Sequence, residues 1–367
     1  MPSALVGFGT AVPRSRVSQA ESIRAAAAMC AETREHEEML GSLYRQTGIE
    51  GRNVAFTAAE VDWVVRGVGR CETPFMPRGK GYGGPTTAER MERYREYATP
   101  LALEASAEAL RESGVEAGGV THLVTVSCTG FSAPGFDVGL IKGLGMRATV
   151  ERTHVGFMGC HGALNGLRVA RGLVAAERRA VVLVCAVELC SIHYHYGWDP
   201  RRMVGNALFA DGAAAVVVRG VNGVDHGEWR HVASGACLFP ESEAAMGWEV
   251  GDRGFEMTLS TKVPGLIGRH LRPWLDEWLG REGLGVEEVG SWAVHPGGPR
   301  ILSELEGVLG LGPERLAISR QVLRDQGNMS SATVLFILRE LRRIGAERPC
   351  VALGFGPGLA AEVLLIR

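Results

Sequence analysis

The sequence predicts an α/β protein whose strands are largely buried, and three features of its 367 residues support this fold class. Runs rich in β-branched residues alternate with runs of helical periodicity, as in folds that stack helices on a sheet. The apolar runs, such as 180–187 and 213–218, are too short to cross a membrane, which takes ~20 residues. Two similar segments, 209–219 and 355–367, each place an aromatic residue and a glycine turn before a strand ending in Arg. This similarity predicts a duplicated α/β unit.

The N-terminal region begins with a predicted strand at 4–10 that runs into a glycine turn. A helix is predicted over 19–41, because Ser18 and Glu21 have the Ser-x-x-Glu spacing of a capping box. In such a box the two side chains bind free backbone N–H groups at the start of the helix. The chain is therefore expected to open with a strand and one long helix.

Residues 66–84 are rich in Gly, Pro and Arg and predict a surface loop. The loop ends at a second capping box, formed by Thr86 and Glu89, which starts the next helix. A run of β-branched residues at 122–128 predicts a strand that ends in a Thr-Gly turn. Strands and helices alternate from there to the last residue.

The duplication also predicts where the chain divides. Its second copy begins near residue 222, after the glycine-containing turn 220–223. The two expected halves are therefore 1–221 and 222–367.

Composition and charge exclude several classes of protein. With 39 Lys+Arg against 41 Asp+Glu the formal net charge is −2, so the chain lacks the basic excess that binding to nucleic acid or an anionic membrane needs. Apolar residues make up 46% and charged residues 22%, which is the usage of a folded globular protein. No export signal is visible, and the 8 cysteines show no C-x-x-C spacing. We therefore expect a cytoplasmic protein with reduced thiols, without a disulfide framework or a metal site.

The first candidate for chemistry is Cys160, in the segment 156–170. Glycines flank the Cys-His pair and allow a strained turn, and apolar residues at helical spacing follow. Cys160 is therefore expected at the first turn of a helix, where the positive end of the helix dipole stabilises a thiolate. Such a thiolate is a usable nucleophile. The alternative is an inert buried cysteine at a strand–helix junction.

Two further candidates lie in the second half of the chain. His295 follows an apolar strand at 291–294 and enters a Pro/Gly-rich turn, a place where α/β proteins carry their sites. Asn328 follows a glycine and precedes an apolar helix. Singly, these residues are explained as a structural histidine and a helix cap. Together, Cys, His and Asn form a catalytic set that papain-like proteases also use, although the surrounding sequence does not fit those proteases.

These segments resemble those of a type III polyketide synthase, the chalcone-synthase-like branch of the thiolase/ketoacyl synthase superfamily. The resemblance covers the chain from about residue 4 to its end. It is carried by Met-Gly-Cys-His-Gly at 158–162, His-Pro-Gly-Gly-Pro at 295–299, Gly-Asn-Met-Ser-Ser-Ala at 327–332 and Gly-Phe-Gly-Pro-Gly-Leu at 354–359. It implies a thiolase-like duplicated αβαβα five-layer architecture, with the nucleophile in the first half and His295 and Asn328 in the second.

The chemistry that the resemblance implies is iterative condensation. Cys160 holds an acyl group from an acyl-CoA starter, while His295 and Asn328 donate hydrogen bonds to the thioester carbonyl of malonyl-CoA. The enolate left by loss of CO2 attacks the Cys160 thioester, and the lengthened chain closes to a pyrone or a resorcinol-type phenol. His295 is also expected to lower the pKa of Cys160 through an ion pair. Gly356 or Gly358 would supply a second oxyanion donor, since proline between them has no N–H.

Two alternatives to this function are open at the level of sequence. One is a ketoacyl synthase III-type enzyme, which condenses only once and takes its extender from a carrier protein. The other is a non-catalytic scaffold that keeps the fold, against which the intact Cys160, His295 and Asn328 argue. The glycine-rich motifs at 327–332 and 354–359 favour the polyketide branch.

The resemblance also implies which residues line the substrate cavity. His193 is an unusual residue at its position, and two roles are open: it shapes or protonates the growing polyketide, or it only fills space. Ala133 replaces a larger residue that reaches into the partner subunit in plant members of the family. Phe209 and Met257 correspond to the two gate residues, and Cys128, His193, Trp248 and Ser330 to lining residues.

The partners implied by the resemblance are the CoA thioesters and a second copy of the chain. The acyl-CoA starter and malonyl-CoA act as substrates, no metal or organic cofactor is needed, and a homodimer is expected. Candidate residues for binding the CoA phosphates are Arg45, Arg52 and Arg300, because Arg suits phosphate recognition. The basic set found on an N-terminal helix in plant members is not reproduced here.

Overall fold

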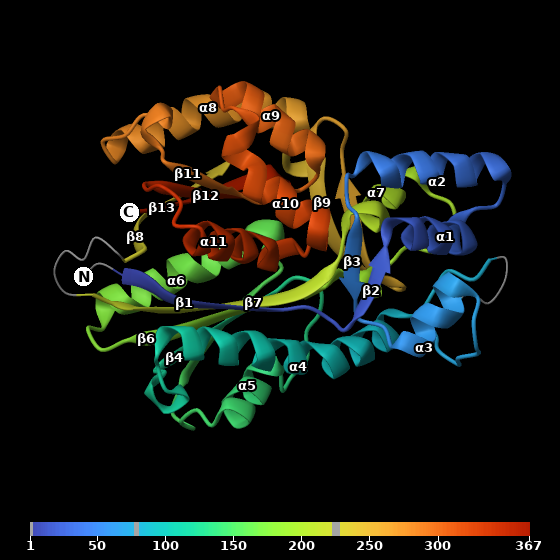
Figure 1. Cartoon of the computed structure of the whole chain (residues 1–367), viewed down its shortest axis with the longest axis horizontal. Helices are drawn as coiled ribbons and strands as arrows, with labels where there is room; N and C mark the ends of the chain where they lie inside the picture. Colours follow the sequence, from blue (N-terminus) through green and yellow to red (C-terminus); the bar gives the residue numbers. More distant parts are fainter. Residues whose placement is uncertain (1–2, 77–80, 222–227) are drawn as a thin grey trace.

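A computed structural model describes residues 3–76, 81–221 and 228–367. Residues 222 and 223, which follow the predicted division and form the second half of the turn 220–223, lie outside the described residues. Within them, helices and strands stack in five alternating layers (Figure 1). The layered α/β architecture predicted for the chain is thus confirmed.

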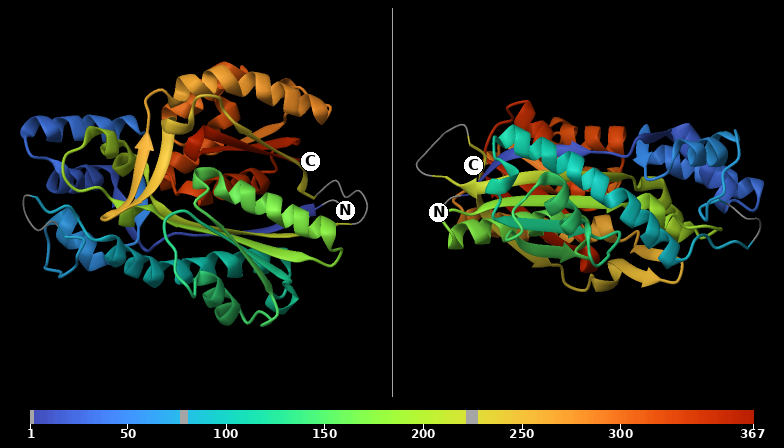
Figure 2. Two further views of the ribbon diagram at one scale, coloured as in Figure 1. Left: turned by 180° about the vertical axis from the view of Figure 1, so that it is seen from behind. Right: turned by 90° about the horizontal axis from the view of Figure 1, so that it is seen from below.

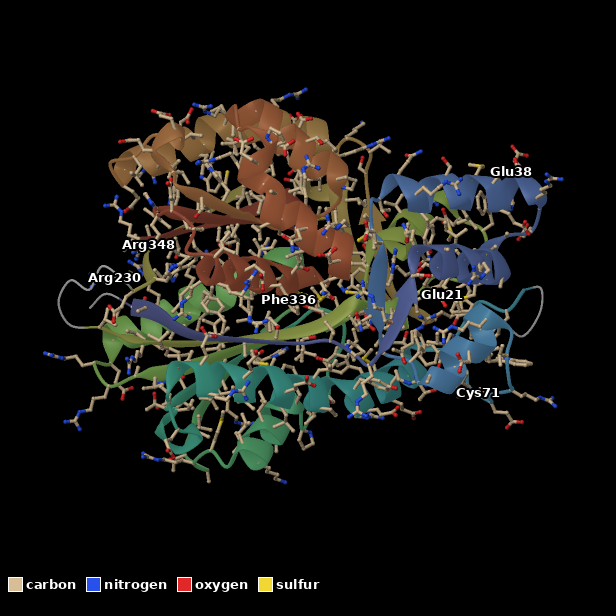
Figure 3. All side chains as sticks on the ribbon, viewed as in Figure 1. Glu21, Glu38, Cys71, Arg230, Phe336 and Arg348 are labelled. Carbon is tan, nitrogen blue, oxygen red and sulfur yellow. The ribbon has the colours of Figure 1, made fainter. Side chains whose placement is uncertain are left out.

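Two outer layers and one central layer of helices alternate with the two groups of strands (Figure 1). One outer layer holds α4 (Thr87–Ser113) and α5 (Phe136–Leu144), and the other holds α8 (Val263–Arg281) and α9 (Pro299–Leu309). The central layer, between the two groups of strands, holds α6 (Gly162–Ala176) and α11 (Thr333–Arg343). Side chains fill the spaces between these layers, as the sticks in Figure 3 show.

The strands form one nine-stranded sheet in the order β11-β12-β13-β8-β1-β7-β6-β4-β5. The two groups of strands meet where β1 pairs with β8 at only two positions, Ser3 with His231 and Ala4 with Arg230. From this short junction the two groups diverge, which leaves room for the central helices (Figure 2). The strands are β1 (Ser3–Ala11), β4 (His122–Ser127), β5 (Glu151–Gly156), β6 (Val181–Leu189), β7 (Asp211–Gly220), β8 (Arg230–Leu238), β11 (Ser291–Val294), β12 (Cys350–Gly356) and β13 (Ala360–Ile366).

Burial of both faces explains why the strands are continuously apolar in sequence. In β6, Val182 and Val184 point into the core shared with α6 and α11. The alternate residues Leu183 and Cys185 point into the core shared with α4 and α5. A strand covered on both sides has no polar face, so a Val-rich run such as this one reads as unbroken apolar sequence.

The duplicated segments both lie in antiparallel pairs, β6 with β7 and β12 with β13. Their connections differ greatly in length. Between β12 and β13 there is only the 3-10 turn Pro357–Leu359, whereas β6 and β7 are separated by the 3-10 turn Cys190–His193 and helix α7 (Pro200–Leu208).

Local sequence signals located the helix starts correctly. The capping boxes predicted at Ser18 and Thr86 are both formed. The helix predicted over 19–41 is instead two helices, α1 (Gln19–Cys30) and α2 (Arg34–Gln46). The break has a physical cause, because Ala31 is extended and Thr33 caps a new helix by accepting a hydrogen bond from the backbone N–H of His36. The described part of the predicted loop 66–84 has no regular element beyond the end of a π-helical turn at Arg66.

Several smaller elements lie beyond one end of the sheet and surround the site described below (Figure 1). These are α1 and α2, the pair β2 (Ser15–Ser18) and β3 (Gly51–Val54), the helical turns α3 (Ala58–Val61) and Asp62–Arg66, α7, and α10 (Ala317–Gln326). The hairpin of β9 (Met246–Gly251) and β10 (Gly254–Leu259) reaches from the half with α8 towards the half with α4 (Figure 2).

Candidate active site

Cys160 lies in a tight turn between β5 and α6, as the sequence predicts. The chain leaves β5 through Phe157 and Gly159, which have φ of 58° and 76°, and then forms the 3-10 turn Gly159–His161 that leads into α6. A Cβ atom on Gly159 would lie 2.2 Å from Cδ of Pro357. Only glycine therefore allows this turn to pack against the turn between β12 and β13.

The surroundings of Cys160 keep its thiol protonated at rest. Burial raises the pKa of Cys160 to about 12, and the negative charge of Glu188 adds to this shift, while a hydrogen bond from Ser330 opposes it. Ser330 Oγ lies 3.7 Å from Cys160 Sγ. Cys160 lies in the 3-10 turn that leads directly into α6, close to the predicted position at the first turn of a helix. Loss of water around the sulfur favours the thiol over the thiolate.

His295 follows β11 and is held by the neighbouring strand, since its backbone N–H donates to Leu353 O at 2.8 Å. The side chain is 2% exposed, and neither ring nitrogen has a hydrogen-bond partner among the described residues. Burial, together with the positive charge that His161 can carry, lowers the pKa of His295 to about 3. The described residues contain no hydrogen bond between the side chains of His295 and Cys160. The raised pKa of Cys160 and the lowered pKa of His295 both disfavour the ion pair expected from the sequence.

An unpartnered buried imidazole is informative because such groups are costly. Leaving a buried donor or acceptor unsatisfied costs ~1–3 kcal/mol, and nearly all buried polar groups in proteins are paired. The free ring nitrogens of His295 thus mark a place where a polar ligand atom is to be received.

Asn328 acts as a helix cap and also keeps a free hydrogen-bond donor, as its two predicted roles require. Its backbone bridges to the end of α7, donating to Leu208 O at 3.0 Å and accepting from the N–H of Ala210 at 2.9 Å. The side-chain Oδ1 accepts from the backbone N–H of Ser330 at 2.8 Å, as in a helix cap. This bond fixes the amide so that its Nδ2 donor has no partner within the described ranges and is available to a ligand.

Short contacts bring the three predicted residues into one region. Ser330 binds Asn328 through its backbone and Cys160 through its hydroxyl. Gly356 at the end of β12 approaches the nucleophile turn so closely that a Cβ there would lie 2.7 Å from Met158 O. Because His295 is bonded to the same strand at Leu353, both halves of the chain converge at these strand ends.

A buried carboxylate that the sequence analysis missed supports the nucleophile turn. Glu188, at the end of β6, accepts hydrogen bonds from the backbone N–H of Cys128 at 3.0 Å, from Thr129 Oγ1 at 2.8 Å and from Ser331 Oγ. Burial raises its pKa to about 7. The available signal was a charged residue inside an otherwise apolar strand, which rarely occurs without partners.

Cys128 lies behind the nucleophile turn. It is 2% exposed, and its Sγ accepts from the backbone N–H of Gly159 at 3.0 Å. The thiol thus positions the turn that carries Cys160, so its predicted role as a lining residue is corrected to one of support.

His193 is a wall residue, and the structure contradicts a role in proton transfer. Its Nε2–H donates to Thr129 O at 2.6 Å, and its Nδ1 accepts from the backbone N–H of Phe255 at 2.9 Å. Burial lowers its pKa to about 3. The ring stacks on Phe255 with centroids 4.2 Å apart and meets the edge of Trp248 at 5.7 Å. With both ring nitrogens bonded to backbone groups, His193 shapes the cavity, and neither nitrogen is free to exchange a proton with a substrate.

Trp248 and the two gate residues lie around the same space. Trp248 Nε1–H donates to Cys128 O at 2.7 Å, and Trp248 pairs with Met257 across the β9–β10 hairpin. A Cβ on Gly205 would lie 3.3 Å from Met257 and 3.7 Å from Phe209, so the two gate side chains are neighbours over α7. Trp248, Met257, Phe209 and His193 line one cavity of about 430 Å³.

The three candidate arginines have different surroundings. Arg52 is 4% exposed, and its guanidinium donates to the carbonyl oxygens of Asn206, Ala207 and Phe209. It holds α7 in place and is not available to a phosphate, which corrects the prediction that it binds CoA. Arg45 and Arg300 are exposed.

Two further properties follow from the described residues. None of their helices is both long and apolar enough to pass through a bilayer. Residues 3–76, 81–221 and 228–367 contain no group of three or more His, Cys, Asp or Glu arranged to hold a metal ion.

Known proteins resemble this chain along its whole length. The family model of the chalcone and stilbene synthases, N-terminal domain, matches residues 2–222, and the model of their C-terminal domain matches residues 231–367. Bisdemethoxycurcumin synthase from Oryza sativa subsp. japonica is 37% identical over 298 residues, 77% of this chain and 74% of that protein. 1,3,6,8-Tetrahydroxynaphthalene synthase from Streptomyces peucetius subsp. caesius is 31% identical over 363 residues, 98% of this chain and 91% of that protein.

Solved structures of similar fold agree with these sequence matches. PKS-I from the brown alga Ectocarpus siliculosus superimposes with a TM-score of 0.93 at 31% identity, covering 100% of this chain and 98% of that one. The C-terminal type III polyketide synthase domain of Steely1, a type I/III hybrid from Dictyostelium, gives a TM-score of 0.88 at 26% identity, covering 100% and 99%. The chain therefore belongs to the chalcone and stilbene synthase family, the type III polyketide synthases, which are acyl-transferring enzymes.

Proposed function

We propose that this enzyme extends an acyl-CoA starter, held on Cys160, by iterative decarboxylative condensation with malonyl-CoA. The observation that carries the proposal is the pair of unused hydrogen-bonding groups, the ring of His295 and Nδ2 of Asn328, in the region of the strand ends that also holds the half-buried thiol of Cys160. Membership of a family whose relatives are named as polyketide-forming synthases supports the same reaction.

In the first step of this proposal, the thiol of Cys160 attacks the thioester carbon of the starter. Its proton passes to the free nitrogen of His295, and the S–CoA bond breaks as the new S–acyl bond forms. The leaving CoA thiolate then takes the proton from His295, which returns to its neutral form. Transfer at the moment of attack suits two groups whose resting states are both neutral.

In the second step, malonyl-CoA replaces the released CoA. His295 N–H and Asn328 Nδ2–H donate to its thioester oxygen, CO2 departs, and the negative charge collects on that oxygen as an enolate. The enolate carbon attacks the Cys160 thioester, and the Cys160 sulfur leaves. Donors fixed in place before the reaction stabilise this charge without reorganising, and each is typically worth ~10²–10³ in rate.

The product of this proposal is a short ketide that closes to a pyrone or a phenolic ring. Trp248, His193 and Phe255 form an aromatic wall. Trp248 donates to Cys128 O, His193 donates to Thr129 O, and the backbone N–H of Phe255 donates to His193. A rigid wall leaves the growing chain little depth in that direction, so the chain folds back on itself.

We further propose that Arg45 and Arg300 contact the CoA phosphates and that Gly356 or Gly358 provides a backbone donor to the Cys160 thioester. No metal or organic cofactor is required, because loss of CO2 supplies the carbanion equivalent. A cytoplasmic location is supported by the 8 free cysteines, which suit a reducing compartment. We propose no nucleic-acid partner.

We also propose that the enzyme is a homodimer joined along β5. This strand ends the sheet, and most of its residues are exposed, although unpaired edge strands are normally protected. Phe131, Phe157 and Met158 next to it are 55%, 37% and 38% exposed.

Light scattering should give twice the mass of one chain at micromolar concentration. A mass of one chain would contradict the dimer.

The reaction is tested by incubating the enzyme with malonyl-CoA and an acyl-CoA starter and identifying the products by mass. We expect products that contain two or more extender units, because the β-ketoacyl-CoA released by one condensation can acylate Cys160 again, with loss of CoA, and then meet another malonyl-CoA. A single β-keto product would contradict iteration and favour the single-condensation alternative.

A further inference from the structure

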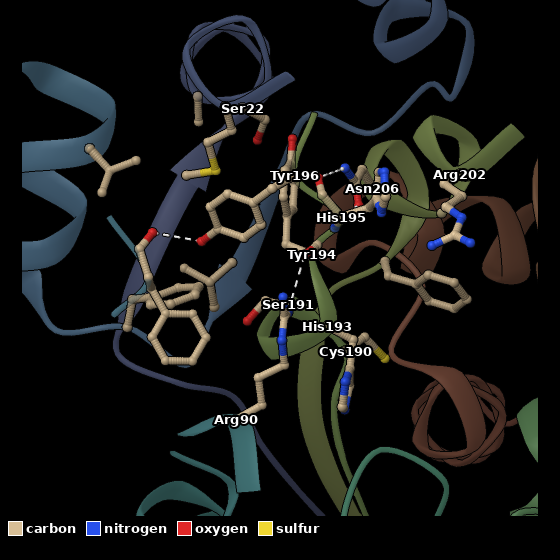
Figure 4. Close-up of a pocket in the computed structure, with 18 of the residues that line it drawn as sticks. Ser22, Arg90, Cys190, Ser191, His193, Tyr194, His195, Tyr196, Arg202 and Asn206 are labelled. Atoms are coloured by element: carbon tan, nitrogen blue, oxygen red, sulfur yellow. Dashed lines mark hydrogen bonds between the residues drawn. The ribbon is translucent and has the colours of Figure 1, made fainter. Parts of the chain in front are cut away.

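The cavity of about 430 Å³ that begins at Phe209 and Met257 continues beneath the N-terminal helices. Its far walls come from α1, β3, the helical turns 58–66 and the segment 190–196 after β6. Figure 4 shows Ser22 of α1 on one side of this space, with Tyr194 and Tyr196 facing it. Apolar side chains that line it include Ala25, Met29, Val54, Phe56, Val64 and Phe75.

The polar tyrosine and carboxylate atoms in these walls are already used. The hydroxyls of Tyr44 and Tyr194 share a hydrogen bond of 2.9 Å, and Tyr196 Oη donates to Phe75 O at 2.6 Å. Glu60 is paired with Arg93 at 2.6 Å. A ligand here gains little from its own polar groups.

Most of the cationic donors in the cavity walls are paired as well. Arg52 and Arg90 donate to backbone carbonyl oxygens, such as Tyr194 O at 3.1 Å from Arg90, although Nε of Arg52 is buried without a partner among the described residues. At the end near the gate, Arg202 and Glu256 form an ion pair of 2.6 Å. The walls therefore present mainly carbon, which favours a hydrocarbon ligand over CoA or a ketide, whose amide and keto oxygens need donors.

None of Cys160, His295 and Asn328 lines the cavity, but two of its lining residues are bonded to neighbours of the catalytic region. Phe209 lines it and is bridged through its backbone to Asn328, the proposed enolate donor. His193 also lines the cavity and donates a hydrogen bond to Thr129 O. Thr129 follows Cys128, which supports the turn that carries Cys160. A chain that enters past Phe209 and Met257 can thus have its carbonyl end near the catalytic region.

We propose that this cavity holds the alkyl chain of the starter, a saturated acyl group of medium length. This inference rests on the proposed function, since it assigns the substrate class of the same site. Since a water molecule takes ~30 Å³ of liquid volume, 430 Å³ has room for roughly 14 atoms of that size. Chains of about 10–14 carbons therefore fit, and each buried methylene should improve affinity about fourfold.

Ala25→Phe tests the assignment, because the added ring fills the cavity from α1. We expect kcat/KM with dodecanoyl-CoA to fall at least tenfold, while kcat/KM with acetyl-CoA stays within about twofold. Ala28→Phe is the matched control, since Ala28 lies on the same helix but is exposed and outside the lining. It should leave both values unchanged. Equal losses with both starters, or none with either, would overturn the proposal.

A second variant keeps the test valid if Ala25→Phe does not fold. Val64→Phe narrows the cavity from the opposite wall and should give the same selective loss, with an unchanged melting temperature as the check on folding. Intact-protein mass spectrometry distinguishes a failure of the proposed function from a failure of the cavity assignment alone. If no acyl-CoA of any length acylates the enzyme, the proposed function fails. If acetyl-CoA acylates it but dodecanoyl-CoA does not, only the cavity assignment fails.

Discussion

Replacing Cys160 by serine is expected to lower polyketide formation by roughly 10³-fold or more, since loss of a nucleophile removes the covalent route altogether. A serine hydroxyl at this position is a far weaker acid than a thiol, and burial lowers the pKa of the nearest proposed base, His295, to about 3. Products are measured by mass after incubation with malonyl-CoA and an acyl-CoA starter. The acyl adduct on the intact protein should disappear together with the product.

Two comparisons sharpen this expectation. Cys237→Ser removes a half-exposed thiol elsewhere and should leave product output unchanged. Decarboxylation of malonyl-CoA should persist in Cys160→Ser, because His295 and Asn328 remain. Undiminished ketide formation in Cys160→Ser would refute the assignment of the nucleophile.

The protonation state of Cys160 has its own readout. With its pKa raised to about 12 by burial, the thiolate fraction keeps growing with pH through neutrality. The rate of alkylation by iodoacetamide should therefore rise steadily from about pH 6 to pH 9. A plateau near pH 7 would indicate the low-pKa thiolate that the sequence alone suggested.

Replacing His295 by alanine is expected to slow malonyl-CoA decarboxylation by ~10²–10³-fold, because one of two enolate donors is lost. Release of CO2 is measured without a starter, so that acylation of Cys160 does not enter the result. Condensation should fall at least as far, since the imidazole is also the proposed acceptor of the thiol proton.

His231→Ala is a suitable control for His295→Ala. His231 is also buried, with a pKa lowered to about 3 by burial, but it pairs with Ser3 at the opposite end of β1 from the site. It should alter stability without altering the rate per folded molecule. A similar loss of rate in both variants would show that the effect of His295 is structural.

Local signals in the sequence were reliable because the interactions behind them are local. Ser18 and Glu21, or Thr86 and Glu89, are three residues apart and bond to each other's backbone, so their spacing is sufficient. The break between α1 and α2 was missed because Thr33 caps its helix without a Glu or Gln three residues on. The turn at Cys160 was found because the flanking glycines require it.

The side-chain roles and the pKa that the sequence could not predict depend on residues far away along the chain. The roles of His193 and Arg52 are set by carbonyl oxygens 64 and more than 150 residues away in sequence. The pKa of Cys160 likewise depends on burial and on the hydrogen bond from Ser330 in the second half of the chain, neither of which its own segment predicts. Neither these distant partners nor the degree of burial produces a recognisable pattern in the sequence.

The unequal connections of the two duplicated strand pairs have an evolutionary consequence. The short turn between β12 and β13 packs against Gly159 and tolerates almost no change, whereas the long excursion between β6 and β7 contributes His193, Phe209 and much of the cavity wall. The short connection is thus held to one conformation by the nucleophile turn, while the long connection has room to vary. Starter preference can change through the middle of the long connection, provided that its last residues keep their bonds to the backbone of Asn328.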